Sequence, residues 1–188
     1  MYRYNVQKVA NAIILALELG VKRLGKTKLM KLLFFADREH LRRYGRPIFY
    51  DRYIKEKMGP VPSITYGIIS SYNDKELDDF KEEVRELLSW VEIEEREVGY
   101  SRPMMQFKKK REFDTELFSR SELKVLKEVF SRFKDANAEE ISELSHKLPE
   151  YASATMYDII PYEAMAGDMA EYVKYWQEER EAFEKAVR

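Results

Sequence analysis

The chain has 188 residues and 45% hydrophobic content, which is enough apolar material for one sizeable core. It contains no cysteine, which excludes a disulfide scaffold, thiolate chemistry and a cysteine-ligated zinc site and fits a cytoplasmic protein. The net charge of −1 conceals a split, because residues 1–65 hold 14 basic and 5 acidic side chains while residues 66–188 hold 19 and 29. The basic N-terminal third therefore leaves an anionic partner open.

Two helices are predicted in the first third of the chain from the spacing of apolar residues. The first runs from about Asn5 to Leu19, and its apolar run at residues 12–17 is too short to span a membrane, so we expect no membrane partner. The second runs from Thr27 to Tyr44 and ends at Gly45, a residue type that commonly follows the last helical turn. Its apolar stripe is wide enough for a central helix and comprises Leu29, Leu32, Leu33 and Ala36.

Two antiparallel hairpins are predicted between the helical segments. The first lies around Asp51 and Arg52, where residues alternate and include aromatics, and we expect residues 59–62 to close it as a turn. Pro62 suits the first turn of a further helix that runs to about residue 72. The second hairpin pairs residues 91–98 with residues 104–113, because one arm is rich in Glu and the other in Lys.

Helix starts in the rest of the chain carry capping signals, in which a Ser, Asp or Asn precedes a Glu by three residues. Four such pairs begin at Asn73, Ser119, Asn137 and Asp168. The first predicts a helix over residues 74–89. The predicted fold class is mainly α (α+β): a compact helical domain with one or two small antiparallel β hairpins and a winged-helix-like N-terminal part. Without repeats or linkers, residues 1–188 are expected to form a single domain with no appended module.

Residue patterns typical of catalysis are missing from the sequence. The two histidines, His40 and His146, lie far apart, and neither an HExxH nor a paired-aspartate pattern accompanies them. The sequence has no phosphate-binding glycine loop and no nucleophile elbow, and a cysteine nucleophile is excluded. We therefore predict no enzyme, no catalytic residue, no metal and no cofactor.

Asp37 is the most informative carboxylate, because it shares a face of the second predicted helix with Leu33 and should be partly buried. A buried carboxylate needs a hydrogen-bonding or cationic partner, and Arg52 or the backbone amides of the following hairpin would serve. We favour this structural role over that of a ligand-facing acid. His146 is interpreted in the same way, as a donor to a nearby carbonyl or side chain rather than as a titrating contact.

A basic stripe beginning at Lys28 lies on one outer face of the second predicted helix. Such a stripe suits phosphates, so a winged-helix-like DNA-binding regulator is one hypothesis. Against DNA, the stripe offers no Asn, Gln or Ser for reading base edges, and the acidic remainder would repel a duplex. A solvated helix face and a contact for a protein partner are the other interpretations. The predicted partner-binding residues are Lys31, Phe35, Arg38 and Arg42.

Residues 28–63 carry four motifs: a K-L-x-K-L-L-x-F-A-D run, a Tyr-Gly-Arg-Pro turn, an Asp-Arg-Tyr segment and a Gly-Pro-Val-Pro sequence. In these motifs, and in later segments at residues 113–125, 138–146 and 160–164, the chain resembles the Panacea domain family of SocA-like antitoxins and phage-associated GepA-like proteins. Relatives often carry a Trp at Tyr151, whose packing role should survive. The motif residues, expected to be mainly structural, are Asp37, Tyr44, Gly45, Pro47, Asp51, Tyr53, Gly59, Pro60, Pro62, His146 and Pro161.

The resemblance implies a non-enzymatic binding protein. Members of this family are typically antitoxins of two-gene toxin–antitoxin systems that bind toxins of many unrelated folds, and SocA-like members also deliver the toxin to a protease. The leading hypothesis is a cytoplasmic antitoxin-like protein that neutralises a cognate toxin, encoded by an adjacent gene, through direct binding. A winged-helix-like transcriptional regulator is the alternative.

Overall fold

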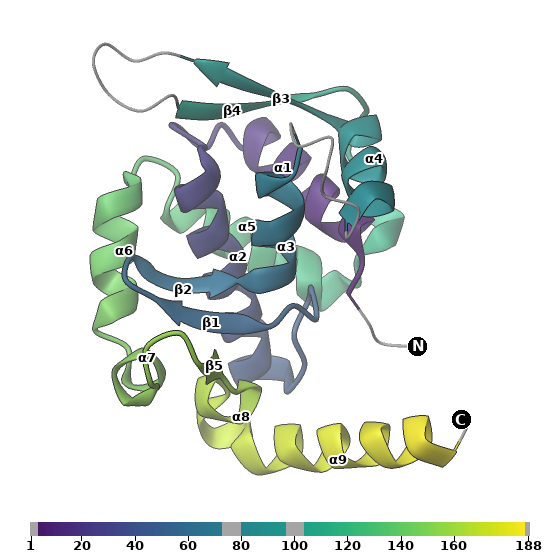
Figure 1. Cartoon of the computed structure of the whole chain (residues 1–188), viewed down its shortest axis with the longest axis vertical. Coiled ribbons are helices and arrows are strands. Elements are labelled where there is room, and N and C mark those ends of the chain that lie inside the picture. The colour runs from purple at the N-terminus through teal and green to yellow at the C-terminus, as the bar shows by residue number, and fades with distance from the viewer. Residues whose placement is uncertain (1–3, 73–79, 97–103, 187–188) are drawn as a thin grey trace.

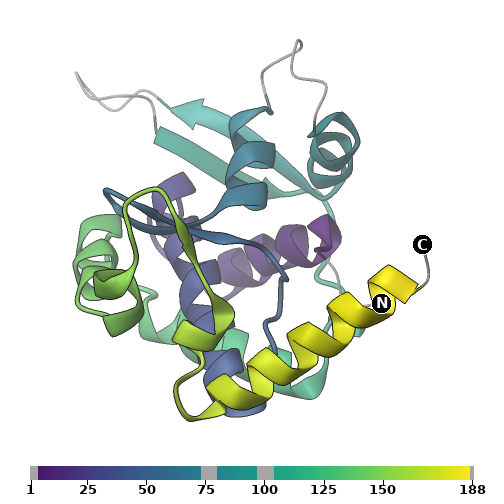
Figure 2. The same ribbon diagram turned by 60° about the horizontal axis from the view of Figure 1, so that its bottom comes forward.

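The structure is a computed structural model that describes residues 4–72, 80–96 and 104–186 (Figure 1). Its helices, in chain order, are α1 (Val6–Glu18), α2 (Lys26–Tyr44), α3 (Ser63–Ser70), α4 (Lys81–Trp90), α5 (Arg120–Arg132), α6 (Ala138–His146), α7 (Pro149–Ser153), α8 (Tyr162–Met165) and α9 (Ala170–Ala186). Its strands are β1 (Tyr53–Glu56), β2 (Gly59–Pro62), β3 (Val91–Arg96), β4 (Met104–Lys109) and β5 (Ile159–Ile160). The β3–β4 hairpin and α9 lie at opposite ends of the molecule (Figures 1 and 2). The predicted fold class, mainly α with small antiparallel hairpins, is confirmed.

Helix α2 lies at the centre of the fold, as its wide apolar stripe predicted. The four residues of that stripe are fully buried, and the helix packs against α5, α6 and β2. The helix ends at Gly45, whose φ of 68° lies in the left-handed region that residues with a side chain seldom adopt. A Cβ at this position would also collide with the ring of Tyr172 on α9. Backbone conformation and available space therefore both require glycine here.

The first hairpin belongs to a three-stranded antiparallel sheet with the order β2–β1–β5, in which Tyr53 lies opposite Pro62. The sequence placed this hairpin correctly but its turn wrongly: the turn consists of Lys57 and Met58, and residues 59–62 form strand β2. Prolines are accommodated there because β2 is an edge strand, where a residue without an N–H can face away from the sheet. Strand β5 was not predicted.

The second hairpin pairs β3 with β4 in the antiparallel arrangement that the opposite charges of its arms predicted. Glu92 lies opposite Lys108, and the Lys108 ammonium forms an ion pair with Glu94. Because this pair is exposed, it helps to set the register more than it stabilises the fold. The connection between the two strands, at residues 97–103, lies outside the described residues.

Two of the four predicted capping pairs are confirmed. Ser119 and Asn137 each accept the N–H of the Glu three residues later, whose carboxylate accepts the N–H of the capping residue. The pair at Asn73 and the first part of the helix expected over residues 74–89 lie outside the described residues, and α4 covers the rest. The fourth prediction is wrong, because Asp168 lies within a 3₁₀ turn before α9 begins at Ala170.

Two clusters of buried apolar side chains share α2. The larger lies among α1, α2, α5 and the β3–β4 hairpin and includes Leu33 and Phe130. The smaller lies among α2, α7, β5, α8 and α9 and includes Phe34 and Val173. Tyr151 is buried in the smaller cluster, so this aromatic residue retains the packing role expected of it.

Candidate functional site

Asp37 is the hydrogen-bonding centre of the sequence motif. It is fully buried on α2, and its Oδ1 accepts the backbone N–H groups of Ile48 and Phe49 at 2.6 and 3.0 Å. Its Oδ2 accepts the hydroxyl of Tyr53 at 2.8 Å. Burial raises the pKa of this carboxyl from 3.8 to about 7, although the three donors act in the opposite direction. Backbone amides, rather than Arg52, are therefore its main partners, and Asp37 ties α2 to the β1–β2 hairpin.

Asp51 has a related structural role at the start of α3. Its carboxylate accepts the backbone N–H groups of Ile64 and Thr65 at 2.9 and 2.8 Å. These bonds satisfy the first turn of a helix whose capping residue, Pro62, provides no side-chain acceptor. Burial raises the pKa of Asp51. The hydroxyl of Tyr162 donates to the Asp51 carbonyl, so the same residue also links the sheet to α8.

Other residues of the family motifs lie at the ends of helices or in the adjoining loops. The ring of Tyr44 contacts that of His40 in a tilted arrangement at the end of α2, Pro47 is buried in the following loop, and Pro161 precedes the first residue of α8. The prediction for His146 is wrong: this side chain is exposed and stacks on Tyr151, with ring centroids 4.9 Å apart, and within the described residues it makes no hydrogen bond. Its aromatic ring, not a polar contact, covers Tyr151.

The four predicted partner-binding residues do not form one exposed stripe. Lys31 is fully buried, so the expectation that it lies on an outer face is wrong. Phe35 is half-buried and packs against the end of α5, and Arg38 pairs with the buried carboxylate of Glu150. Arg42 is the exposed member of the four. Helical spacing assigned these residues to one face, but tertiary contacts cover most of that face, and their role in binding stays a prediction.

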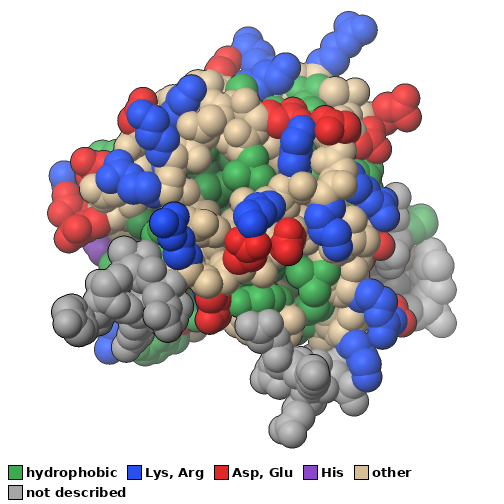
Figure 3. Space-filling model, turned by 90° about the horizontal axis from the view of Figure 1, so that it is seen from above, with side chains coloured by type: hydrophobic (Ala, Val, Ile, Leu, Met, Phe, Trp, Pro, Cys, Tyr) green, Lys and Arg blue, Asp and Glu red, His purple; other side chains and the backbone are tan. Residues whose placement is uncertain are grey.

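Other cations of the N-terminal third also have hydrogen-bonding or ion-pair partners within the fold. Lys28 is fully buried, and its ammonium donates to three carbonyls of the α1–α2 and α5–α6 loops at 2.6 to 3.0 Å. Lys8, Lys22 and Arg43 pair with carboxylates from the C-terminal part of the chain. Acidic and basic side chains are accordingly mixed over the face shown in Figure 3. The described part of the chain therefore lacks the continuous basic stripe that the DNA hypothesis required.

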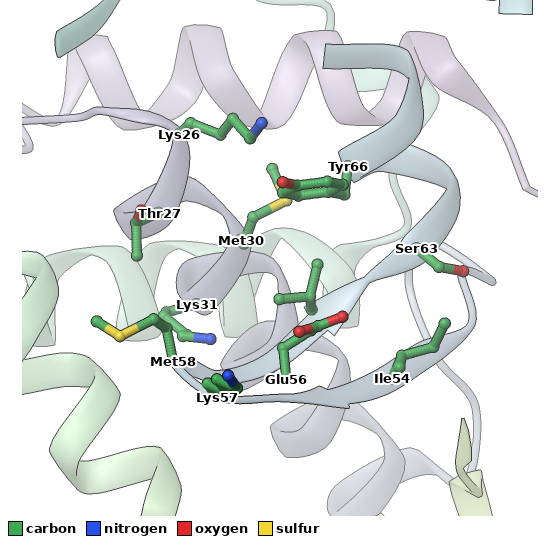
Figure 4. A pocket seen from close by; sticks show the side chains of 11 residues that line it. Lys26, Thr27, Met30, Lys31, Ile54, Glu56, Lys57, Met58, Ser63 and Tyr66 are labelled. Atoms are coloured by element: carbon green, nitrogen blue, oxygen red, sulfur yellow. The ribbon is translucent and has the colours of Figure 1, made fainter. Parts of the chain in front are cut away.

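A pocket of about 480 Å³ opens between the N-terminal end of α2, the β1–β2 hairpin and α3 (Figure 4). Its apolar lining is formed by Met30, Ile54, Met58, Val61 and Tyr66. Met58 and Tyr66 are 57% and 44% exposed. Two large apolar side chains exposed beside one pocket form a surface that a partner would cover favourably.

The charged lining of the pocket consists of three lysines and one glutamate: Lys26, Lys31, Lys57 and Glu56. The Lys26 ammonium lies 3.9 Å from the centroid of the Tyr66 ring and donates to Ser70. The adjacent N-terminus of α2 adds partial positive charge, because Gly25 provides no side-chain cap and the first turn contains no acidic residue. The pocket is therefore net positive and suits an anionic group that is flanked by apolar surface.

Lys31 lies at the floor of this pocket and differs from Lys28, one turn earlier. Its ammonium donates to the carbonyl of Pro60 at 2.8 Å, its only hydrogen bond among the described residues. Gly59, with a φ of 95°, lets the hairpin approach closely, because a Cβ there would lie 2.9 Å from Nζ. Burial lowers the pKa of Lys31 from 10.5 to about 7, while Glu56 acts in the opposite direction. In Figure 4 the Lys31 and Glu56 side chains face the same space.

Among the residues that line the pocket, Lys31 alone was predicted as a site residue, so Lys57, Glu56, Met58 and Tyr66 were missed. Ile54 and Glu56 are two positions apart on β1 and thus share a face, a signal that the alternating sequence contains. With residues 59–62 taken as a turn, however, that face had no partner strand. Correct placement of the turn at residues 57–58 would have paired β2 with β1, but it would not have shown that β2 lies beside α2.

Within the described residues, no group of His, Asp and Glu side chains could hold a metal ion, and no helix is long and apolar enough to cross a membrane. A mainly helical domain with a positive, partly apolar pocket has the features of a binding module.

The family model described as antitoxin SocA-like, Panacea domain, matches residues 29–151, and the chain belongs to this family. The match includes most of α2, every described element from β1 to α6 and the first part of α7. The searches of curated proteins and of solved structures returned no match.

Proposed function

We propose that this protein is the antitoxin of a two-gene toxin–antitoxin system and that it neutralises a cognate toxin by binding it directly. The observation that carries the proposal is the match of an antitoxin-like family to residues 29–151, which include most of the central helix and the whole β1–β2 hairpin. The pocket beside that hairpin offers a protein partner positive charge together with apolar surface. Binding alone, without catalysis, would inactivate the toxin by covering it or by holding it in an inactive state.

The proposed partner is the product of an adjacent gene, and the proposed place of binding is the cytoplasm, in keeping with a chain that contains no cysteine. We do not extend the proposal to DNA. Lys28 and Lys31, which would have to face phosphates, are buried, and Arg38 is paired with Glu150. Neutralisation by surface contact also requires no metal or cofactor.

Co-expression tests this function. The adjacent gene is induced in a bacterial host either alone or together with this chain, and growth is followed. We expect arrest with the adjacent gene alone and restored growth with both, and the two purified proteins should co-elute as a complex. The proposal fails if the neighbouring product is not toxic, or if growth stays arrested while this protein accumulates in folded form.

A further inference from the structure

The pocket between α2, the β1–β2 hairpin and α3 carries positive charge that its own contacts leave uncompensated. The buried ammonium of Lys28 has three carbonyl acceptors, which match its three N–H donors, whereas the buried ammonium of Lys31 has one. At the rim, Lys57 is exposed and has no ion pair within the described residues. Lys31 therefore keeps two N–H donors without an acceptor among the described residues, and it lines the pocket.

The burial of Lys31 strengthens the electrostatic interaction between its ammonium and an anion in the pocket. The residue has no exposed surface, so water screens its ammonium poorly, and an anion in the pocket interacts with it more strongly than with a solvated lysine. Lys57 and the uncapped N-terminus of α2 act on the same space from the other sides. Glu56 is the opposing charge that lines the pocket.

We infer that this pocket receives a glutamate or aspartate side chain of the cognate toxin, with a neighbouring apolar residue of the toxin packed against Met58 and Tyr66. The inference rests on the proposed function, because it names the contact through which the antitoxin holds its toxin. The carboxylate lies above Lys31 and beside Lys57, while the apolar neighbour covers the exposed rim. A chain segment that alternates acidic and apolar residues fits both parts of the surface.

A single carboxylate fits this pocket better than a phosphate does. Charge alone does not decide between the two, because the three lysines attract a doubly charged group more strongly while Glu56 repels it more strongly. Apolar side chains also form a large part of the lining, and they gain nothing from a bare inorganic anion. A partner protein supplies the charge and the apolar surface together.

Calorimetry with the purified toxin tests the pocket directly. Lys57→Glu reverses a charge at the exposed rim. We expect it to weaken binding by about tenfold or more, which is the size of effect that loss of a charge-assisted hydrogen bond produces. Lys31→Met removes the buried charge at similar volume and should weaken binding by a comparable factor. The matched control is Lys127→Met on α5, an exposed lysine outside the pocket, which should change affinity by less than about twofold.

A pH profile separates the charge of Lys31 from a merely structural role. The charged groups that face it are Lys26, Lys57 and Glu56, and the pKa of Lys31 of about 7 means that its charge is lost as the pH rises through that value. The wild-type affinity should therefore decrease between about pH 6 and about pH 8.5 more steeply than the affinity of Lys31→Met. Titrating groups of the toxin are common to both curves, so the difference reports on Lys31.

The outcomes distinguish this inference from the proposed function. If the wild-type protein neither binds nor neutralises the toxin, the proposed function fails. If the wild type binds but folded Lys57→Glu and Lys31→Met bind as tightly as the Lys127→Met control, the pocket is not the contact and the inference is overturned while the function stands. Parallel pH profiles of wild type and Lys31→Met overturn the part assigned to Lys31. Circular dichroism and thermal unfolding establish that each variant is folded.

Discussion

Replacing Asp37 by Ala removes the shared acceptor of three buried donors. The backbone N–H groups of Ile48 and Phe49 then lose the one acceptor that they have in the described part of the chain, because Asp37 Oδ1 receives both. The hydroxyl of Tyr53 is less affected, since it can still donate to the carbonyl of Leu33, at 3.3 Å. The substitution therefore leaves two buried amides without an acceptor and removes the hydrogen bonds between α2 and the loop before the β1–β2 hairpin.

The expected cost follows from those two amides. A buried donor without an acceptor costs about 1 to 3 kcal/mol, so two cost about 2 to 6 kcal/mol. Removal of a buried carboxylate recovers part of its own desolvation penalty, which offsets some of this loss. We expect Asp37→Ala to lower the free energy of unfolding by about 2 to 4 kcal/mol, a large share of the 5 to 15 kcal/mol that is typical of a domain.

Urea denaturation followed by circular dichroism measures this loss, and Asp37→Asn is the matched control. The amide oxygen of Asn still accepts both backbone N–H groups, so this variant should lose less stability than Asp37→Ala. It also removes the titration of the carboxyl group. Because burial raises the folded-state pKa of Asp37 to about 7, above its ordinary 3.8, the native state retains a proton that the unfolded state releases. Wild-type stability should therefore fall, relative to Asp37→Asn, as the pH rises from about 4 to about 7.

Two results would refute this reasoning. A loss of less than about 1 kcal/mol for Asp37→Ala would show that the two amides find other acceptors at no cost. Equal pH dependence of wild type and Asp37→Asn would show that the carboxyl group titrates at the same pH in the folded and unfolded states.

Three further predictions concern stability and are measured by the same denaturation experiment. Gly45→Ala should destabilise the protein by about 1 kcal/mol or more, because its φ is 68° and the added Cβ collides with α9; an unchanged midpoint would contradict this. Lys31→Met should be more stable than wild type below about pH 7, because burial lowers the folded-state pKa of Lys31 to about 7. This gain in stability should shrink toward pH 10, where the wild-type lysine is neutral in the folded state. A gain independent of pH would argue against a charged Lys31. Arg38→Ala should cost about 3 kcal/mol because it leaves the buried Glu150 unpaired, whereas Arg42→Ala should cost less than about 0.5 kcal/mol; similar losses would show that the ion pair is not important.

The sequence predicted those structural elements that depend on contacts between residues close together in the chain. The capping pairs at Ser119 and Asn137 bond within one helical turn, and Gly45 ends α2 through its own backbone conformation. The apolar stripe of α2 predicted a central helix because it is too wide for a helix with one exposed face. For the same reason the burial of Asp37 could be inferred from its place beside that stripe.

Contacts between distant segments account for most of what the sequence did not predict. Lys28 is buried because two loops that lie apart in sequence direct carbonyls to its ammonium. Arg38 is covered by Glu150, and β1 gains β5 as a neighbour from about a hundred residues away. Helical spacing gives the face on which a lysine lies but not what packs against that face. The pocket was missed because it forms only when β2 lies beside α2.

Direct binding between this protein and the product of the adjacent gene is the central claim, and isothermal titration calorimetry with the two purified proteins tests it most directly. We predict saturable binding of the wild-type protein, weakened by about tenfold or more in Lys57→Glu. A titration in which the folded wild-type protein produces no saturable binding heat over a range of temperatures, and the two proteins also elute separately, would contradict the account.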